Sequence, residues 1–231
     1  EACLPTPYEI DGKGQKINRG VKYTYLSAIK RSIDVIFRDT LNACLRRRKP
    51  NSYQIYGWST SGFRRMSNHR FVARNSVIIN NIKRRKIVYF PLHLEPEVAL
   101  LQFAPEFNNT MEAIVWVSKA LPADYVLVVK EQAIGYAVRS KQFYRRLKSI
   151  PNVVLAHPGS DSWEWIKTAR FVATMTGTAG LEAVHFNKAV ISFGRHQIIN
   201  VLPTVYHVES VKEVNKAVEI LTKQQVSQDD L

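Results

Sequence analysis

The sequence has little cysteine and no long hydrophobic run. Its 231 residues include two cysteines, Cys3 and Cys44, whose separation fits neither a common metal-binding spacing nor a disulfide framework. No stretch of about 18 apolar residues occurs, so a membrane-spanning helix is not expected. These absences predict a reducing, cytoplasmic environment and neither a structural nor a catalytic metal site.

Motifs that identify many nucleotide-binding and hydrolytic enzymes are also missing. The chain has no Walker A loop and no G-x-G-x-x-G dinucleotide fingerprint, and it lacks the G-x-S-x-G nucleophile elbow. Zinc-finger spacing and RNA-recognition signatures are absent, so nucleic acid is not an expected partner. The sequence starts at Glu1 without an initiator Met or a signal-peptide pattern, and we expect it to be a fragment that lacks its natural N-terminal part.

Acidic residues are scarce in the first third of the chain. Residues 1–86 hold 19 Lys and Arg against 5 Asp and Glu, whereas the remaining residues hold 14 of each sign, so the net charge of +14 arises entirely in this third. A surface this basic attracts polyanions such as acidic lipid head groups, acidic glycans or nucleic acid. The alternatives are an ordinary solvated face or a contact surface for a missing domain.

The same region carries one clear helical pattern. Along residues 21–48 apolar side chains recur every fourth residue, which predicts an amphipathic helix with a basic outer side. We expect the stripe to pack into a core, and docking on a membrane surface is the alternative. Residues 51–76 have no clean period, and residues 77–85 fit a short helix. We expect residues 1–86 to be a basic helical or irregular segment, or the end of a missing N-terminal lobe.

From residue 87 onward, short apolar runs alternate with longer helical patterns. This alternation is typical of βαβ units, and it predicts an α/β lobe over residues 87–231, with a parallel sheet and helices on both faces. The expected strands are 87–90, 125–129, 153–156, 171–175, 189–193 and 205–208, and the expected helices are 110–121, 140–149, 162–169, 178–186 and 211–222.

One loop of this lobe stands out as a candidate phosphate site. In an open parallel sheet, ligands bind at the carboxyl ends of the strands. The sequence TGTAGLEA, residues 176–183, follows an apolar strand and opens a helix, whose free amides and dipole favour an anion. Glu182 would lie one turn into the helix, where it could accept hydrogen bonds from ribose hydroxyls. The alternative is a tight turn that needs glycine for its backbone alone.

Three other strand ends carry polar residues. Lys130, beside Glu131, could neutralise a phosphate leaving group, although a surface ion pair is the commoner use. Glu95 and Glu97 could act as an acid or base or orient a sugar hydroxyl, or they could belong to a proline-shaped loop. His157 could approach phosphate or ribose, but a lone histidine is more often structural. The four loops would meet at one edge of the sheet.

These segments together resemble the capsular and surface polysaccharide biosynthesis proteins. The resemblance covers about half of the chain, between residues 87 and 208. It is carried by YFPLHLEPE, VVKE, PNVVL, VATMTGTAGLEA and KAVISFG in that order. It implies a Rossmann-like donor-binding lobe of a two-lobed, glycosyltransferase-B-type enzyme.

The resemblance also implies roles for individual residues. Donor phosphates would be held by the glycine turn and its helix, the ribose by Glu182, and the leaving phosphate by Lys130. The residues of the turn are Thr176, Gly177, Thr178, Ala179 and Gly180. One departure bears on activity, because Gln132 and Ala133 replace the His-Pro pair that the family usually has after this strand.

The sequence therefore predicts a glycosyltransferase that uses a nucleotide-activated sugar in bacterial surface polysaccharide assembly. The nucleotide-sugar would be a substrate, and no further cofactor is expected. The acceptor would be a glycan or a lipid-linked glycan, and the protein would be cytoplasmic or peripheral to the inner membrane through its basic region. The alternatives are a non-catalytic module that binds glycan or a partner, which Gln132 favours, and a sugar-nucleotide epimerase.

Overall fold

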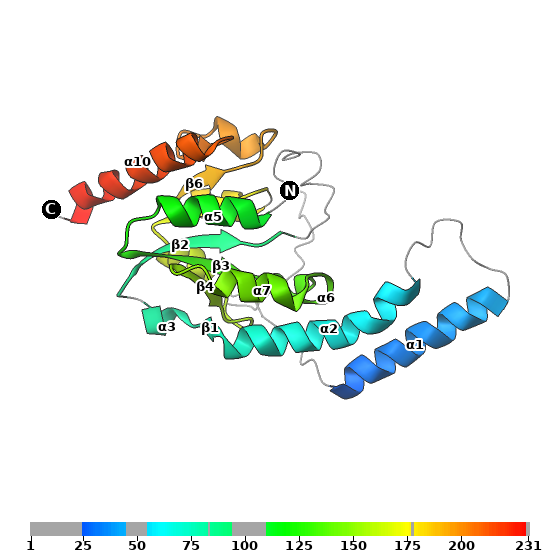
Figure 1. Ribbon diagram of the computed structural model, residues 1–231. Coiled ribbons are helices and arrows are strands. Elements are labelled where there is room, and N and C mark those ends of the chain that lie inside the picture. Colours follow the sequence, from blue (N-terminus) through cyan, green and yellow to red (C-terminus); the bar gives the residue numbers. More distant parts are fainter. Residues whose placement is uncertain (1–24, 45–54, 83, 94–109, 177, 230–231) are drawn as a thin grey trace, which may run out of the picture.

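The computed structural model of the chain describes residues 25–44, 55–82, 84–93, 110–176 and 178–229 (Figure 1). Its centre is a seven-stranded sheet in which every pairing is parallel. The strand order is β1-β4-β3-β2-β5-β6-β7. The strands are β1 (Ser76–Val77), β2 (Lys86–Pro91), β3 (Tyr125–Lys130), β4 (Val153–Ala156), β5 (Phe171–Thr174), β6 (Ala189–Ser192) and β7 (Val205–His207).

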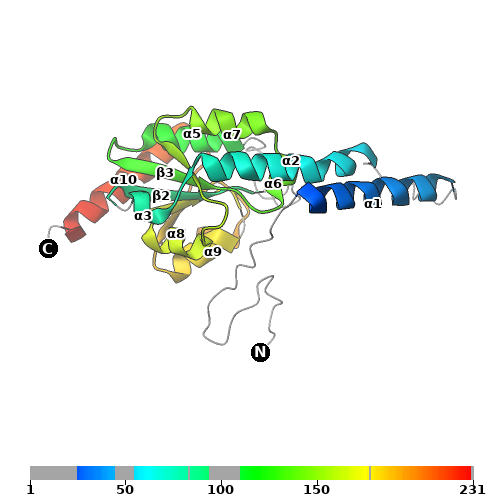
Figure 2. The same ribbon diagram turned by 90° about the horizontal axis from the view of Figure 1, so that it is seen from below.

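Helices cover both faces of the sheet (Figures 1 and 2). One layer contains α5, α7 and α10, and the opposite layer contains α8 and α9. The bounds are α5 (Thr110–Ala120), α6 (Gly135–Val138), α7 (Lys141–Lys148), α8 (Ser162–Thr168), α9 (Thr178–His185), the 3₁₀ helix η2 (Ile198–Val201) and α10 (Val211–Asp229). The predicted α/β class, with a parallel sheet between two helical layers, is confirmed.

The strands form because they are short apolar runs that can be buried on both sides. Successive side chains of a strand point to opposite faces, so β3 sends Leu127 and Val129 into the layer with α5 and α7, and Val126 and Val128 into the layer with α8. Continuous apolar runs of this kind are typical of parallel strands covered on both faces. Trp165 of α8 is the largest fully buried side chain of the second layer.

Two long helices precede the sheet, α1 (Tyr25–Cys44) and α2 (Ile55–Arg74). They lie antiparallel and contact each other, while α2 also contacts α6 and α7 (Figures 1 and 2). The expected helix over residues 21–48 is present as α1. Sequence periodicity missed α2, because its buried side chains include a polar one and form no clean apolar stripe. In its C-terminal part Met66, Asn68 and Val72 are buried.

The sheet also extends further toward the N-terminus than expected. After α2 the chain forms β1, which pairs with β4, and then α3 (Ile79–Ile82). Both elements precede residue 86, the expected end of the N-terminal segment. A two-residue strand is too short to leave a periodic pattern in the sequence, so nothing there indicated that the sheet includes it. Within the described residues, no helix combines the length and apolar character needed to cross a membrane.

Candidate functional site

The strand order places a topological switch point between β2 and β5. From β2 the chain moves to β3 and β4 on one side, and it then crosses to β5, β6 and β7 on the other side. The connections after β2 and after β5 therefore leave in opposite directions, and open α/β sheets bind ligands in the crevice expected at such a point, outside the carboxyl ends of the strands. Of the four candidate loops, the two that flank this crevice are the one after β2 and the glycine turn after β5, residues 176–180.

The glycine turn begins deep in the protein. Thr176 is fully buried, and its backbone carbonyl accepts a hydrogen bond of 2.9 Å from the Thr174 hydroxyl. The Thr176 hydroxyl itself is buried and has no hydrogen-bond partner within the described part of the chain. A buried polar atom without a partner is costly, so this hydroxyl is suited to a ligand that reaches the turn. Gly177 lies outside the described residues.

Helix α9 starts at Thr178, which is exposed, while Ala179 and Glu182 are partly buried. Gly180 is buried against the sheet. A Cβ there would lie 2.5 Å from Ile199 Cδ1 and 3.4 Å from Thr174 Cγ2. The second glycine of the turn therefore allows close packing of α9 against η2 and β5. The first turn of α9 thus lies directly beyond the end of β5.

The loop after β6 supports the turn from the other side. A Cβ on Gly194 would lie 2.7 Å from the backbone carbonyl oxygen of Met175. The Gln197 side chain donates a long hydrogen bond of 3.4 Å to the same oxygen. Asn200 Nδ2 donates to the Gly194 carbonyl at 2.7 Å. The absence of a side chain at Gly194 therefore lets the loop after β6 approach the backbone of Met175, the residue just before Thr176, and hold it in place.

Lys130 ends β3 and is partly buried beside β2, opposite Pro91. Tyr89 of β2 lies opposite Val172, so Pro91 and Thr174 are at the same level two residues further on. Adjacent strands lie about 4.8 Å apart, so Lys130 and Thr174 are separated by about 10 Å across β2. A lysine side chain spans part of this distance, so the Lys130 ammonium can meet a ligand that lies over the end of β2.

Glu131 follows Lys130 and is part of a buried polar network. Its carboxylate accepts hydrogen bonds from Arg139 Nε at 2.8 Å, the Tyr144 hydroxyl at 2.8 Å and the Gln132 amide at 2.9 Å. Arg139 also donates to the backbone carbonyl of His93 in the loop after β2. Arg139 thereby ties the loop after β2 to the loop after β3, beside the crevice.

Burial governs the protonation of this network. Desolvation is the largest effect and raises the pKa of the Glu131 carboxyl above its usual value. Arg139 and the hydrogen bonds from Tyr144 and Gln132 oppose this rise. Burial and the nearby Glu131 carboxylate raise the pKa of Tyr144 far above its usual range, so its hydroxyl stays protonated and donates. Sequence analysis singled out Glu131 but missed Arg139 and Tyr144, because their positions eight and thirteen residues further along the chain do not indicate that they meet its carboxylate.

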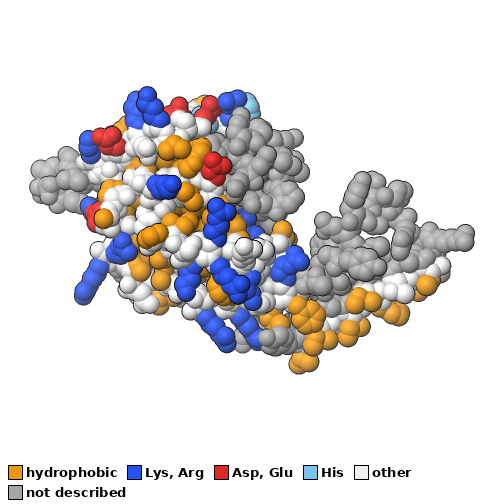
Figure 3. Space-filling model, viewed as in Figure 1, with side chains coloured by type: hydrophobic (Ala, Val, Ile, Leu, Met, Phe, Trp, Pro, Cys, Tyr) orange, Lys and Arg blue, Asp and Glu red, His pale blue; other side chains and the backbone are white. Residues whose placement is uncertain are grey.

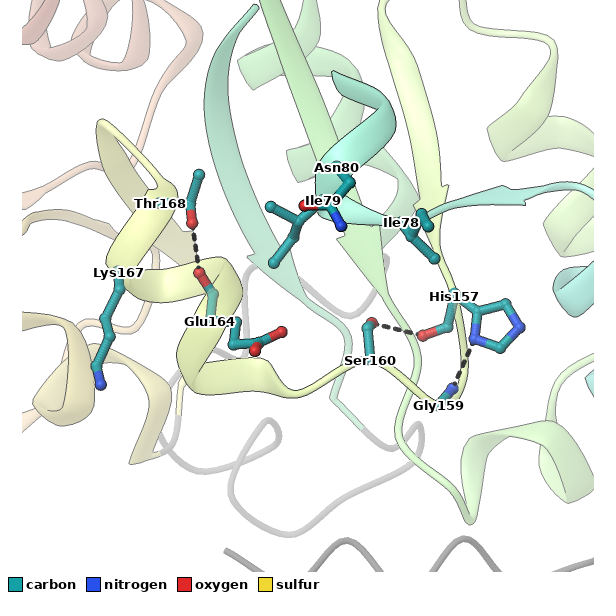
Figure 4. Close-up of a pocket in the computed structure, with 9 residues that line it drawn as sticks. All are labelled: Ile78, Ile79, Asn80, His157, Gly159, Ser160, Glu164, Lys167 and Thr168. Atoms are coloured by element: carbon teal, nitrogen blue, oxygen red, sulfur yellow. Dashed lines mark hydrogen bonds between the residues drawn. The ribbon is translucent and has the colours of Figure 1, made fainter. Parts of the chain in front are cut away.

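His157 lies away from the switch point. It follows β4, which is separated from β5 by β3 and β2, so the two strand ends are about 14 Å apart. Its Nδ1 accepts a hydrogen bond of 3.1 Å from the Gly159 amide. With Ile78, Lys167 and Thr168 it lines an open cavity of about 440 Å³ between α3 and α8 (Figure 4). The structure therefore does not bring His157 next to the glycine turn.

The last two predicted residues follow β2 in the sequence. Glu95 and Glu97 lie outside the described residues, and their roles stay predictions. His93, at the start of the same loop, is buried. No group of three or more His, Cys, Asp or Glu side chains suited to a metal ion occurs within the described ranges.

The sequence matches one family model. The model of the capsule polysaccharide biosynthesis proteins matches residues 11–198, which includes the N-terminal helices, the glycine turn and all strands except β7. No curated protein matches the chain.

Several solved structures are similar to parts of the chain. KpsC of Thermosulfurimonas dismutans, a beta Kdo 2,7 transferase, has 16% identity and a TM-score of 0.43 over 71% of this chain and 56% of that one. UDP-GlcNAc 2-epimerase of Methanocaldococcus jannaschii, in complex with UDP-GlcNAc and UDP, has 14% identity and a TM-score of 0.47 over 79% and 51%. S. aureus MnaA with UDP has 18% identity and a TM-score of 0.42 over 64% and 39%. The chain thus spans between 39% and 56% of the length of these proteins.

Proposed function

The chain belongs to the capsule polysaccharide biosynthesis protein family, and from this premise we propose that it is the nucleotide-sugar-binding part of a glycosyltransferase. The proposed site is the crevice between the ends of β2 and β5. The donor's phosphates would lie against the glycine turn and the first turn of α9, and Glu182 would accept hydrogen bonds from the ribose. The nucleotide-sugar is a substrate here, and the proposal includes no other cofactor.

The observation that carries this proposal is the position of the glycine turn at the switch point. Amides at the start of a helix bind phosphate because they point outward without intrahelical partners and lie at the positive end of the helix dipole. The second supporting observation is the buried Thr176 hydroxyl, which has no partner within the described residues. A phosphate oxygen arriving at the turn would supply one.

Chemistry at this site needs charge stabilisation and a base. When the bond between the anomeric carbon and the phosphate oxygen breaks, negative charge develops on the departing nucleotide, and Lys130 is the proposed cation for it. An acceptor hydroxyl forms the new bond and gives up its proton, for which Glu95 or Glu97 is proposed. The acceptor is proposed to be a glycan or a lipid-linked glycan on the cytoplasmic side of the inner membrane.

Calorimetry combined with a product assay tests this function. The chain is titrated with CMP-, UDP- and GDP-linked sugars, and products are identified after incubation with capsular oligosaccharide. Binding accompanied by sugar transfer supports the proposal. Inversion of the sugar on its nucleotide would instead identify an epimerase. Glycan binding without nucleotide binding would identify a non-catalytic module, the outcome that Gln132 and Ala133 in place of His-Pro favour.

Substitution of Gly177 tests the site itself. Gly177→Val places a branched side chain where the phosphate would approach the backbone, so we expect nucleotide affinity to fall about tenfold or more. The unfolding midpoint is expected to change little. The matched control is Gly159→Val in the turn after β4, where a Cβ would make ordinary contact with His157 Nδ1 at 3.4 Å. Equal affinity of the folded Gly177→Val protein and the wild type would remove the turn from the site.

A further inference from the structure

Helix α1 has a broad apolar face that nothing described covers. Six large apolar side chains on it are exposed, and Leu26 and Phe37 are 79% and 69% exposed. At 100° per residue the six span an arc of about 140°, which is wider than a coiled-coil seam. The members are Leu26, Ile29, Ile33, Ile36, Phe37 and Leu41. We call this set the α1 stripe.

Helix α1, which bears the α1 stripe, projects from the α/β body (Figures 1 and 2). Helix α1 contacts α2, and α2 in turn packs on α6 and α7. Figure 3 shows apolar side chains along the outer edge of α1 and Lys and Arg side chains on the neighbouring face of the body. The stripe and this charged face are therefore adjacent on the molecule.

The neighbouring face is strongly basic because of α2 and α7. Each helix carries four Lys or Arg and no Asp or Glu. The two helices lie side by side, joined by hydrogen bonds from Lys141 to Ser67 and from Lys148 to Asn75. The exposed basic residues are Arg64, Arg70, Arg74, Arg145, Arg146 and Lys148.

An exposed apolar stripe beside a basic face favours one class of partner. A second copy of the chain would bring another +14 charge toward the same face, which opposes association through it. Nucleic acid or a soluble acidic glycan would pair with the arginines but offers nothing to Leu26 or Phe37. An anionic bilayer satisfies both, because its acyl boundary accepts apolar side chains and its head groups attract Lys and Arg.

We propose that α1 lies in the plane of an anionic membrane surface, with the α1 stripe inserted at the head-group boundary and the basic face of α2 and α7 against the lipid phosphates. Lys30, which is exposed within the arc of the stripe, extends its ammonium group to the head groups while its methylenes lie among the apolar side chains. This surface is separate from the β2–β5 crevice, so it stands whether or not the chain transfers sugar.

Vesicle binding tests the proposal with matched variants. The test variant Leu26→Glu/Phe37→Glu charges the α1 stripe. The control Ile198→Glu/Val201→Glu charges two apolar side chains of η2 that are 79% and 82% exposed. On vesicles containing phosphatidylglycerol, we expect the test variant to bind at least tenfold more weakly than the wild type, and the control to bind like the wild type. Vesicles of phosphatidylcholine alone are expected to bind the wild type at least tenfold more weakly.

Cys44 provides a direct reporter of insertion. It is an exposed free cysteine at the end of α1, on the same side of the helix as Leu26 and Phe37. With Cys3→Ser, a polarity-sensitive dye on Cys44 should shift to the blue on anionic vesicles and be quenched by lipids labelled near the glycerol backbone. The proposal is overturned if the stripe variant binds as tightly as the wild type, or if the dye does not respond. It is also overturned if the same substitutions instead abolish a dimer in sedimentation.

Discussion

Replacing Arg139 with methionine should lower the free energy of unfolding by about 3–5 kcal/mol, because the variant leaves the buried Glu131 carboxylate without its cation. The Arg139 and Glu131 side chains are almost fully buried, with Nε and Oε2 2.8 Å apart. Removing Arg139 also frees the His93 carbonyl from its donor. Urea unfolding at pH 8 measures the loss.

The loss should depend on pH in a defined direction. Burial already raises the pKa of Glu131 in the folded protein, and Arg139 opposes this effect. In Arg139→Met the folded-state pKa therefore rises further above the unfolded value. The folded state then binds a proton that the unfolded state releases, so stability is greatest at acidic pH and is lost as pH rises through the raised pKa. The deficit should be smaller at pH 5 than at pH 8.

A double variant separates the buried charge from simple loss of packing. Arg139→Met/Glu131→Gln removes the uncompensated charge but keeps an oxygen acceptor for Tyr144 and the Gln132 amide. It should recover much of the stability lost in Arg139→Met and show no pH dependence from this site. A deficit below about 1 kcal/mol in the single variant at pH 8, or none of this recovery, would contradict the assigned network.

Gly194→Ala should both destabilise the protein and weaken nucleotide binding. Its added Cβ would lie 2.7 Å from the Met175 carbonyl, so the backbone that leads into the glycine turn has to move. Overpacking of this kind costs about 1–3 kcal/mol. Displacement of the turn should reduce nucleotide affinity about tenfold, measured by calorimetry on protein that circular dichroism shows to be folded.

The control for this variant is Gly159→Ala. Its Cβ would make ordinary contact with His157, at a turn that is also between a strand and a helix but away from the switch point. We expect stability and affinity close to wild type. If Gly194→Ala destabilises the protein and leaves affinity unchanged, the loop after β6 supports the sheet without supporting the site.

The sequence predicted the core of the fold because its strands are buried on both faces. Continuous apolar runs such as residues 125–129 can form little else when helical patterns flank them, and β4 begins and ends where expected. Helix α2 was missed because its anchoring contacts are long-range: Asn68 donates hydrogen bonds of 2.9 and 2.8 Å to the carbonyls of Tyr136 and Arg139. Such contacts depend on residues that lie 68 and 71 positions further along the chain, so a local sequence pattern does not reveal them.

The candidate site was predictable in part. A turn of two glycines after a strand indicated residues 176–180 without any knowledge of the strand order. The sequence could not show that this turn and the one at His157 lie apart, because their separation depends on which strands are neighbours. It also could not distinguish Glu131 as a surface ion pair from a buried carboxylate, because its partners Arg139 and Tyr144 meet it only when α6 and α7 fold against β3.

Hydrogen–deuterium exchange on nucleotide binding tests the central claim most directly. UDP, CMP and GDP are each added at saturating concentration, and exchange is compared for peptides covering residues 175–186 and 157–168. A donor phosphate at the start of α9 predicts slower exchange in the first peptide with at least one nucleotide, and little change in the second. Protection confined to the second peptide, or no protection with any of the three, would contradict a nucleotide site at the β2–β5 switch point.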